Sequence, residues 1–178
     1  MKPETARLRE EFADVIRRGN ELAASVDDTI LMRRPAPESW SVAENLEHLS
    51  ATAETFARRI RRRLDGAVAK DVTGEEKRSL VARIWLWLVE PPVRLRLKVP
   101  AAALQPGVIE SRASLLARFE GTHQLLIALL DESDGYDRMR LRIPTPFAKR
   151  ITVTMLDSFA VLAAHGRRHL WQAERALR

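Results

Sequence analysis

Residues 38–49 read ESWSVAENLEHL and contain the clearest helix start in the chain. Ser41 and Glu44 have the spacing of a capping box, in which the hydroxyl of Ser41 accepts the amide of Glu44 and the carboxylate of Glu44 reaches back to the amide of Ser41. Apolar residues then recur every three or four positions, as on one face of a helix. They are Val42, Leu46, Leu49, Ala53, Phe56 and Ile60. We therefore predict a helix that begins at Ser41.

Three further segments have the same helical periodicity. They run from about Leu8 to Val26, from Ser111 to about Gly135, and from about Thr152 almost to the C-terminus. Ser111 and Thr154 are candidate N-caps. Four amphipathic helices without strand–helix alternation predict an all-α fold, a four-helix bundle. The length of 178 residues is too short for two domains, so we expect a single domain over residues 1–178.

The connection between the second and third predicted helices is unusual. It runs from about Asp65 to Glu110, too long for a bare loop in a compact domain. We predict that residues 74–90 add a short helix that ends at the following two prolines. Residues 93–99 and 138–143 alternate with period two and could pair as a small ribbon, although like charges on one face would oppose that pairing.

Composition excludes several classes of function. The chain has no cysteine, so it has no disulfide, thiolate metal site or cysteine nucleophile. Residues 1–12 are charged and lack the apolar core of a signal peptide, and the most apolar stretch, residues 84–89, is too short to span a bilayer. We expect a cytoplasmic protein with no membrane partner. The net charge is +6, but acids lie among the bases and no stacking motif is present, so nucleic acid is not expected as a partner.

Three of the four histidines are candidate metal ligands. His165 and His169 are four residues apart, so their imidazoles share one face of the last helix. His48 lies at the edge of the apolar face of the second helix. Two histidines four residues apart, such as His165 and His169, can occur by chance on a surface helix. A buried histidine such as His48 is often only a hydrogen-bonded residue of the core. Three imidazoles with an open fourth position are nevertheless the pattern of a catalytic zinc site, and nickel, copper and iron also accept imidazole. We predict one divalent metal ion on His48, His165 and His169.

Other residues are candidates for roles near these ligands. Asn45 could contact a ligand or the substrate. His123 lies in the apolar face of the third helix, and we predict a core residue or a partner of the ligands rather than a fourth ligand. Trp85 could wall a substrate pocket, although packing on the bundle or at a dimer contact is the simpler interpretation.

No general base is evident. Glu44 is occupied by its capping box, whereas Glu47 and Asp157 are expected on the solvated surface. Arg167 and Arg168 are expected to point away from the ligand face, since each helical residue turns the side chain by about 100 degrees. One of the two arginines could still pair with a buried acid.

Residues 38–49 resemble the second-helix signature of the DinB-like (damage-inducible) superfamily, and residues 164–173, AHGRRHLWQA, resemble its closing HxxxH helix. The resemblance covers the whole chain in layout. It implies an up-down-down-up four-helix bundle with a long crossover between helices two and three. It also implies a divalent metal, often zinc or nickel, whose ligands map onto His48, His165 and His169.

The resemblance suggests the chemistry as well. Better-studied relatives use the metal in reactions of low-molecular-weight thiols such as mycothiol and bacillithiol. The chain is accordingly expected to be a metal-dependent thiol S-transferase or hydrolase acting on a small electrophile, with such a thiol as a co-substrate. The alternative is a non-catalytic metal-containing module for binding or stress response. The resemblance also implies that the chain can form a homodimer.

Overall fold

Four long helices make up most of the described chain. They are α1 (Pro3–Ala24), α3 (Val42–Asp65), α5 (Arg112–Glu132) and α6 (Met155–Ala176). The computed structural model describes residues 1–70, 76, 78, 80–92, 105–145 and 151–178, without the side chains of residues 80, 81 and 85. This part of the chain is mainly helical, which confirms the predicted all-α class.

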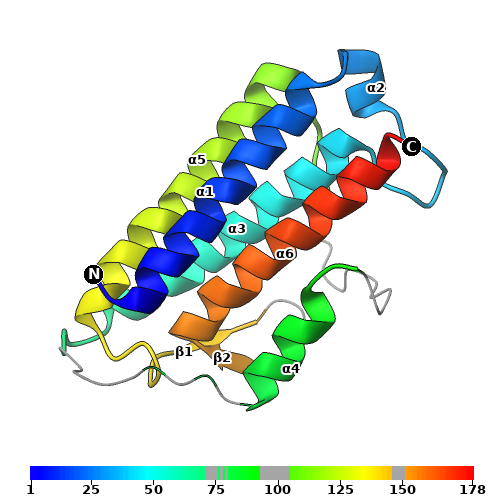
Figure 1. Cartoon of the computed structure of the whole chain (residues 1–178). Coiled ribbons are helices and arrows are strands. Elements are labelled where there is room, and N and C mark those ends of the chain that lie inside the picture. The colour runs from blue at the N-terminus through cyan, green and yellow to red at the C-terminus, as the bar shows by residue number, and fades with distance from the viewer. Residues whose placement is uncertain (71–75, 77, 79, 93–104, 146–150) are drawn as a thin grey trace.

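The long helices lie side by side. Helices α1 and α3 each pack against both α5 and α6. Figure 1 shows α1 and α6 running in one direction along the molecule, and α3 and α5 running in the opposite direction. Buried apolar side chains of all four helices form the core between them. Among the described helices, none combines the length and the apolar character that crossing a bilayer requires.

Three of the four predicted helix starts, at Ser41, Ser111 and Thr154, are confirmed by their caps, whereas α1 begins at Pro3, before the predicted Leu8, without a side-chain cap. Ser41 accepts the amide of Glu44 at 3.1 Å, and the carboxylate of Glu44 accepts the amide of Ser41 at 2.9 Å. Ser111 caps α5 and Thr154 caps α6 in the same positions relative to their helices. These contacts satisfy amides that would otherwise lack a partner in the first turn.

Shorter elements connect the long helices. They are α2 (Asp28–Met32), α4 (Leu80–Val89), the 3-10 turn η2 (Ser133–Gly135), β1 (Arg142–Pro144) and β2 (Thr152–Thr154). The predicted crossover helix is present as α4, which ends before Pro91 and Pro92 and packs against α6.

The predicted ribbon is only partly testable, because residues 93–99 lie outside the described chain. Strand β1 pairs antiparallel with β2, placing Ile143 opposite Val153. Residues 138–140 form a turn and not the start of a strand, so the prediction was wrong for this part. The physical reason is that Arg138 is drawn inward by acidic partners.

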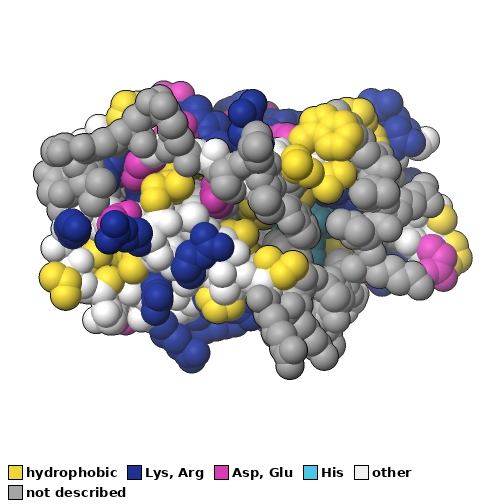
Figure 2. Space-filling view, turned by 90° about the horizontal axis from the view of Figure 1, so that it is seen from below, with side chains coloured by type: hydrophobic (Ala, Val, Ile, Leu, Met, Phe, Trp, Pro, Cys, Tyr) yellow, Lys and Arg dark blue, Asp and Glu magenta, His cyan; other side chains and the backbone are white. Residues whose placement is uncertain are grey.

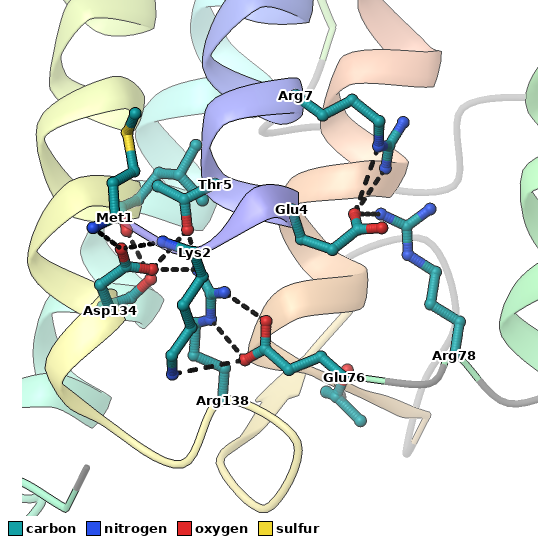
Figure 3. Close-up of polar contacts among 12 residues, drawn as sticks. Met1, Lys2, Glu4, Thr5, Arg7, Glu76, Arg78, Asp134 and Arg138 are labelled. Carbon is teal, nitrogen blue, oxygen red and sulfur yellow. Dashed lines mark hydrogen bonds and ion pairs between the residues drawn. The ribbon is translucent and has the colours of Figure 1, made fainter. Parts of the chain in front are cut away.

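Arg138 is the centre of a buried polar cluster at the end of the molecule that contains the N-terminus (Figure 3). Its side chain is 0% exposed and contacts both carboxylate oxygens of Glu76. It also lies 3.0 Å from Asp134 and donates to the hydroxyl of Thr5 at 2.6 Å. Asp134 in turn accepts the backbone amide of Lys2 at 2.9 Å. The cluster therefore joins α1, the crossover and the turn after α5.

We predict that Arg138→Leu lowers the free energy of unfolding by about 3–5 kcal/mol, because the half-buried carboxylates of Glu76 and Asp134 lose their fully buried cation. Arg140→Leu is the matched control. Arg140 is 82% exposed beside Asp137, so its loss is expected to change stability by less than about 0.5 kcal/mol. Urea denaturation of both variants measures the difference. Equal effects would contradict a structural role for the cluster.

Helices α1 and α6 approach closely at Gly166. A methyl group built there would lie 2.8 Å from Cγ2 of Val15, closer than real side chains approach. By contrast, a methyl group at Gly121 in α5 meets nothing within 4 Å. Gly166 lies between the predicted ligands His165 and His169 in sequence, so its contact with Val15 also fixes the position of this part of α6 against α1.

We predict that Gly166→Ala lowers the free energy of unfolding by about 1–3 kcal/mol through overpacking against Val15. Gly121→Ala is expected to raise it by about 0.5–1 kcal/mol, since alanine favours the helix and has room. Thermal unfolding of the two variants beside the parent would show opposite shifts. A stabilising effect of Gly166→Ala would contradict the close approach.

Candidate metal centre

The three predicted ligands come together between α3 and α6. His48 belongs to α3, whereas His165 and His169 lie one turn apart on α6. One ring nitrogen from each residue can be chosen so that all three lie within 4.8 Å of one another, a group that could hold a metal ion. The side chains are 1%, 8% and 6% exposed, respectively. In the described part of the chain, α3 thus contributes one potential metal ligand to this cluster and α6 contributes two.

The three imidazole rings lie close to one another. Nε2 of His48 lies 3.2 Å from Nε2 of His165. The ring of His169 has its centroid 4.4 Å from the centroids of both other rings. Two protonated imidazoles at this separation would repel each other, whereas neutral rings can direct lone pairs at one ion.

Asn45 orients one of these rings. Its Oδ1 lies 3.0 Å from Nδ1 of His169, and its Nδ2 donates to the carbonyl of Ser41 at 2.9 Å. Because the side-chain oxygen of Asn45 can only accept, Nδ1 of His169 carries the proton and Nε2 keeps its lone pair. A hydrogen bond of this kind commonly fixes the tautomer of a metal-ligating histidine.

The surroundings keep two of the imidazoles neutral. Burial lowers the pKa of His165 and His169 well below the usual value, and the neighbouring histidines and the positive charge of Arg168 lower it further. Neutral imidazole is the form that binds a metal ion. Burial and like charge therefore favour the ligand form at neutral pH.

The predicted orientation was wrong for Arg168. Three helical residues turn by 300 degrees, so Arg168 lies only about 60 degrees from His165 around α6. Its guanidinium is buried and donates to the carbonyl of Leu88, at the end of α4, at 3.3 Å. Arg167 instead reaches outward to two carboxylates, Glu11 at 2.8 Å and Glu90 at 3.1 Å.

The acids near the ligands are mostly engaged by arginines. Glu44 completes its capping box, as predicted, and also binds Arg34 at 2.8 Å. The surface prediction for Glu47 was wrong, because this side chain is buried in an ion pair with Arg118.

The surface prediction for Asp157 was also wrong. Asp157 is buried near the start of α6, and burial raises the pKa of its carboxyl. Arg78 lies 3.9 Å from it. Both errors have one cause: the arginine that accompanies each acid lies far away in sequence.

The other candidate residues have different environments. His123 is buried but does not belong to the three-histidine cluster. Its Nδ1 donates to the carbonyl of Phe119 at 2.7 Å, so the opposite nitrogen is unprotonated in the neutral ring. The side chain of Trp85 lies outside the described part of the structure.

Trp40 was not singled out from the sequence. Its ring lies 4.8 Å from that of His48 and 5.8 Å from that of His169. The signal that could have identified it is its place directly before the N-cap Ser41, at the start of the helix that carries His48.

On the face seen in Figure 2, a small area of histidine surface (cyan) is visible from outside.

The comparisons with known proteins agree with this arrangement. A family model described as the DinB superfamily matches residues 6–173, nearly the whole chain. The chain belongs to the DinB superfamily. Searches among curated proteins and among solved structures gave no match. The sequence therefore establishes the family, and the structure shows that the three histidines of this DinB chain form a cluster that could hold a metal ion.

We predict that His123 makes the metal-free protein sensitive to acid. Burial lowers the pKa of His123 to about 4, and the hydrogen bond to Phe119 opposes this only in part. The unfolded chain takes up this proton near pH 6.5, the folded chain only near pH 4, so stability is lost as the pH falls between these values. His123→Leu should remove a slope of up to about 1.4 kcal/mol per pH unit there.

Denaturation of chelator-treated parent and His123→Leu at pH 7, 5.5 and 4.5 would test this. Identical slopes would show that His123 does not titrate differently on folding. Above pH 7 the two proteins should differ by a constant amount, because the group is then neutral in both states.

Proposed function

We propose that this DinB protein is a metal-dependent enzyme whose single divalent ion is held by His48, His165 and His169. The observation that supports this most directly is the convergence of three buried imidazoles from two helices. We further propose that α1, α3, α5 and α6 form the up-down-down-up bundle of the family, with α4 in its crossover. The directions of the four helices support that topology.

The donor set fits a borderline transition metal. Imidazole nitrogens suit zinc, nickel, copper and iron, whereas magnesium and calcium prefer oxygen. Zinc and nickel are the ions that we propose. Three protein ligands leave coordination positions for a substrate, as in catalytic zinc sites.

Residues around the three histidines already hold them in a form that can bind an ion. Asn45 holds His169 with Nε2 free to bind, and burial keeps His165 and His169 neutral. An ion bound there would act as a Lewis acid that lowers the pKa of a water or thiol that it binds. Because the three histidines are buried, most water is excluded from the parts of their rings that would not face the ion.

The engaged acids favour thiol transfer over hydrolysis. Among the described residues of α3 close to His48 in sequence, Glu44 is bound by Arg34 and Glu47 by Arg118. Activation of water is helped by a general base, whereas a thiol that has already lost its proton attacks an electrophile directly. We therefore propose S-transfer from a low-molecular-weight thiol, such as bacillithiol or mycothiol, to a small electrophile.

We predict that the parent binds about one zinc or nickel ion per chain and that each of His48→Ala, His165→Ala and His169→Ala loses it. His123→Leu is the control, since His123 is a buried histidine outside the cluster and should keep the ion. Elemental mass spectrometry of untagged protein, purified and after reconstitution, measures this. A parent without metal after reconstitution would contradict the proposal.

Turnover separates the enzyme from a non-catalytic metal-containing module. The loaded parent is incubated with a low-molecular-weight thiol and a small electrophile, and consumption of both is followed. The enzyme proposal expects consumption that chelation abolishes and that His123→Leu retains. Full metal occupancy without consumption across a panel of thiols and electrophiles would favour the module.

A further inference from the structure

Trp40 lies directly before the N-cap of α3, a position from which an apolar residue often packs against the first turns of the helix. The residue before an N-cap often packs against the residue four positions after the cap, as a hydrophobic staple. Here the N-cap is Ser41, and the residue four positions later is Asn45, which is polar and bound to His169. The staple therefore has no apolar partner at its usual position, and the packing of the Trp40 ring needs another explanation.

The ring of Trp40 instead lies on two metal ligands from different helices. Its centroid is 4.8 Å from that of His48 on α3. It is 5.8 Å from that of His169 on α6, and those two planes are inclined by only 27°, a stacked arrangement. Both distances are within the range of favourable aromatic pairs. Trp40 thus spans the helix interface at which the ligands meet.

Metal binding would strengthen this stacking. The face of an indole ring carries negative charge density and attracts cations, and tryptophan does so more strongly than the other aromatic residues. An imidazole bound to a divalent ion takes on part of its positive charge, whereas a neutral imidazole does not. The attraction between Trp40 and the two rings is consequently greater with the ion bound.

We propose that Trp40 is a positioning residue of the metal centre, which holds His48 and His169 in their ligating orientation by packing against both rings, tilted on His48 and stacked on His169. The inference rests on the proposed metal site and adds a determinant of its affinity that supplies no ligand atom. Trp40 is half-buried, and its ring lies beside those of His48 and His169.

Trp171 provides a matched comparison. It lies only two residues after His169 on α6, but its ring packs against Arg175, whose guanidinium carbon is 4.9 Å from the ring centroid. Both tryptophans are half-buried. Replacing either tryptophan removes an indole of the same size. Of the described ring contacts that the two tryptophans make, only those of Trp40 involve proposed ligands.

Titration of metal-free protein with Co²⁺, followed by visible absorption, tests the inference. Trp40→Leu is expected to raise the Kd for Co²⁺ by roughly 2- to 30-fold, the range of a cation–π contact. Trp40→Phe keeps a weaker ring and should fall between parent and Trp40→Leu. Trp171→Leu should leave the Kd within about twofold of the parent value.

Melting temperatures separate positioning from packing. If Trp40 acts on the bound state, the rise in melting temperature caused by Co²⁺ is smaller in Trp40→Leu than in the parent. A lower melting temperature without metal, with an unchanged Kd, would overturn the inference, as would equal weakening by Trp171→Leu. If Trp40→Leu does not fold, the Kd of Trp40→Phe decides, and a value equal to that of the parent overturns it.

Failure of the two proposals can be told apart. A parent that binds no Co²⁺, zinc or nickel overturns the proposed function and this inference together. Binding by the parent with an unchanged Kd in both Trp40 variants overturns only the role of Trp40.

Discussion

The hydrogen bond between His169 and Asn45 is the contact on which the arrangement of the site depends. Asn45 is in the first turn of α3, and its amide group also binds the carbonyl of Ser41, the residue that starts the helix. One side chain therefore joins the cap of α3 to His169, a proposed ligand on α6. The position of His48 on the same helix is then set relative to His169, so the start of α3 determines where three imidazoles meet.

That arrangement buries polar groups, and the structure compensates for them in a consistent way. An unsatisfied polar group in the interior costs about 1–3 kcal/mol, and a buried charge costs more. His169 is paired with Asn45, His123 with the carbonyl of Phe119, and Arg138 with acids. The lowered pKa values of His165 and His169 show the remaining cost, which falls on the protonated form. The same burial that penalises protons leaves nitrogen lone pairs suited to a metal ion.

The sequence predicted those features that depend on residues a few positions apart. The capping box of Ser41 and Glu44 and the pairing of His165 with His169 follow from helical geometry alone. Glu47 was assigned to the surface because its partner Arg118 is 71 residues away, and no local pattern reveals such a pair. Arg138 was placed in a strand for the same reason, since Glu76 is 62 residues away. Arg168 differs, because its angle to His165 could have been worked out from the sequence.

Helix α6 is held from two sides, and this limits where the site can adapt. Behind the ligands, Gly166 lets α1 approach so closely that Val15 leaves no room for a methyl group. In front, Asn45 and His48 of α3 contact the imidazoles directly. Close-packed helix interfaces do not deform gradually, so these two sides hold the histidines of α6 rigidly. Other described residues near the three histidines are Trp40, before α3, Leu88 at the end of α4, which meets Arg168, and His123 of α5, which acts electrostatically on His165. Differences in substrate among proteins with this ligand set should therefore arise from the residue before the cap and from the crossover, and not from the helices that carry the histidines.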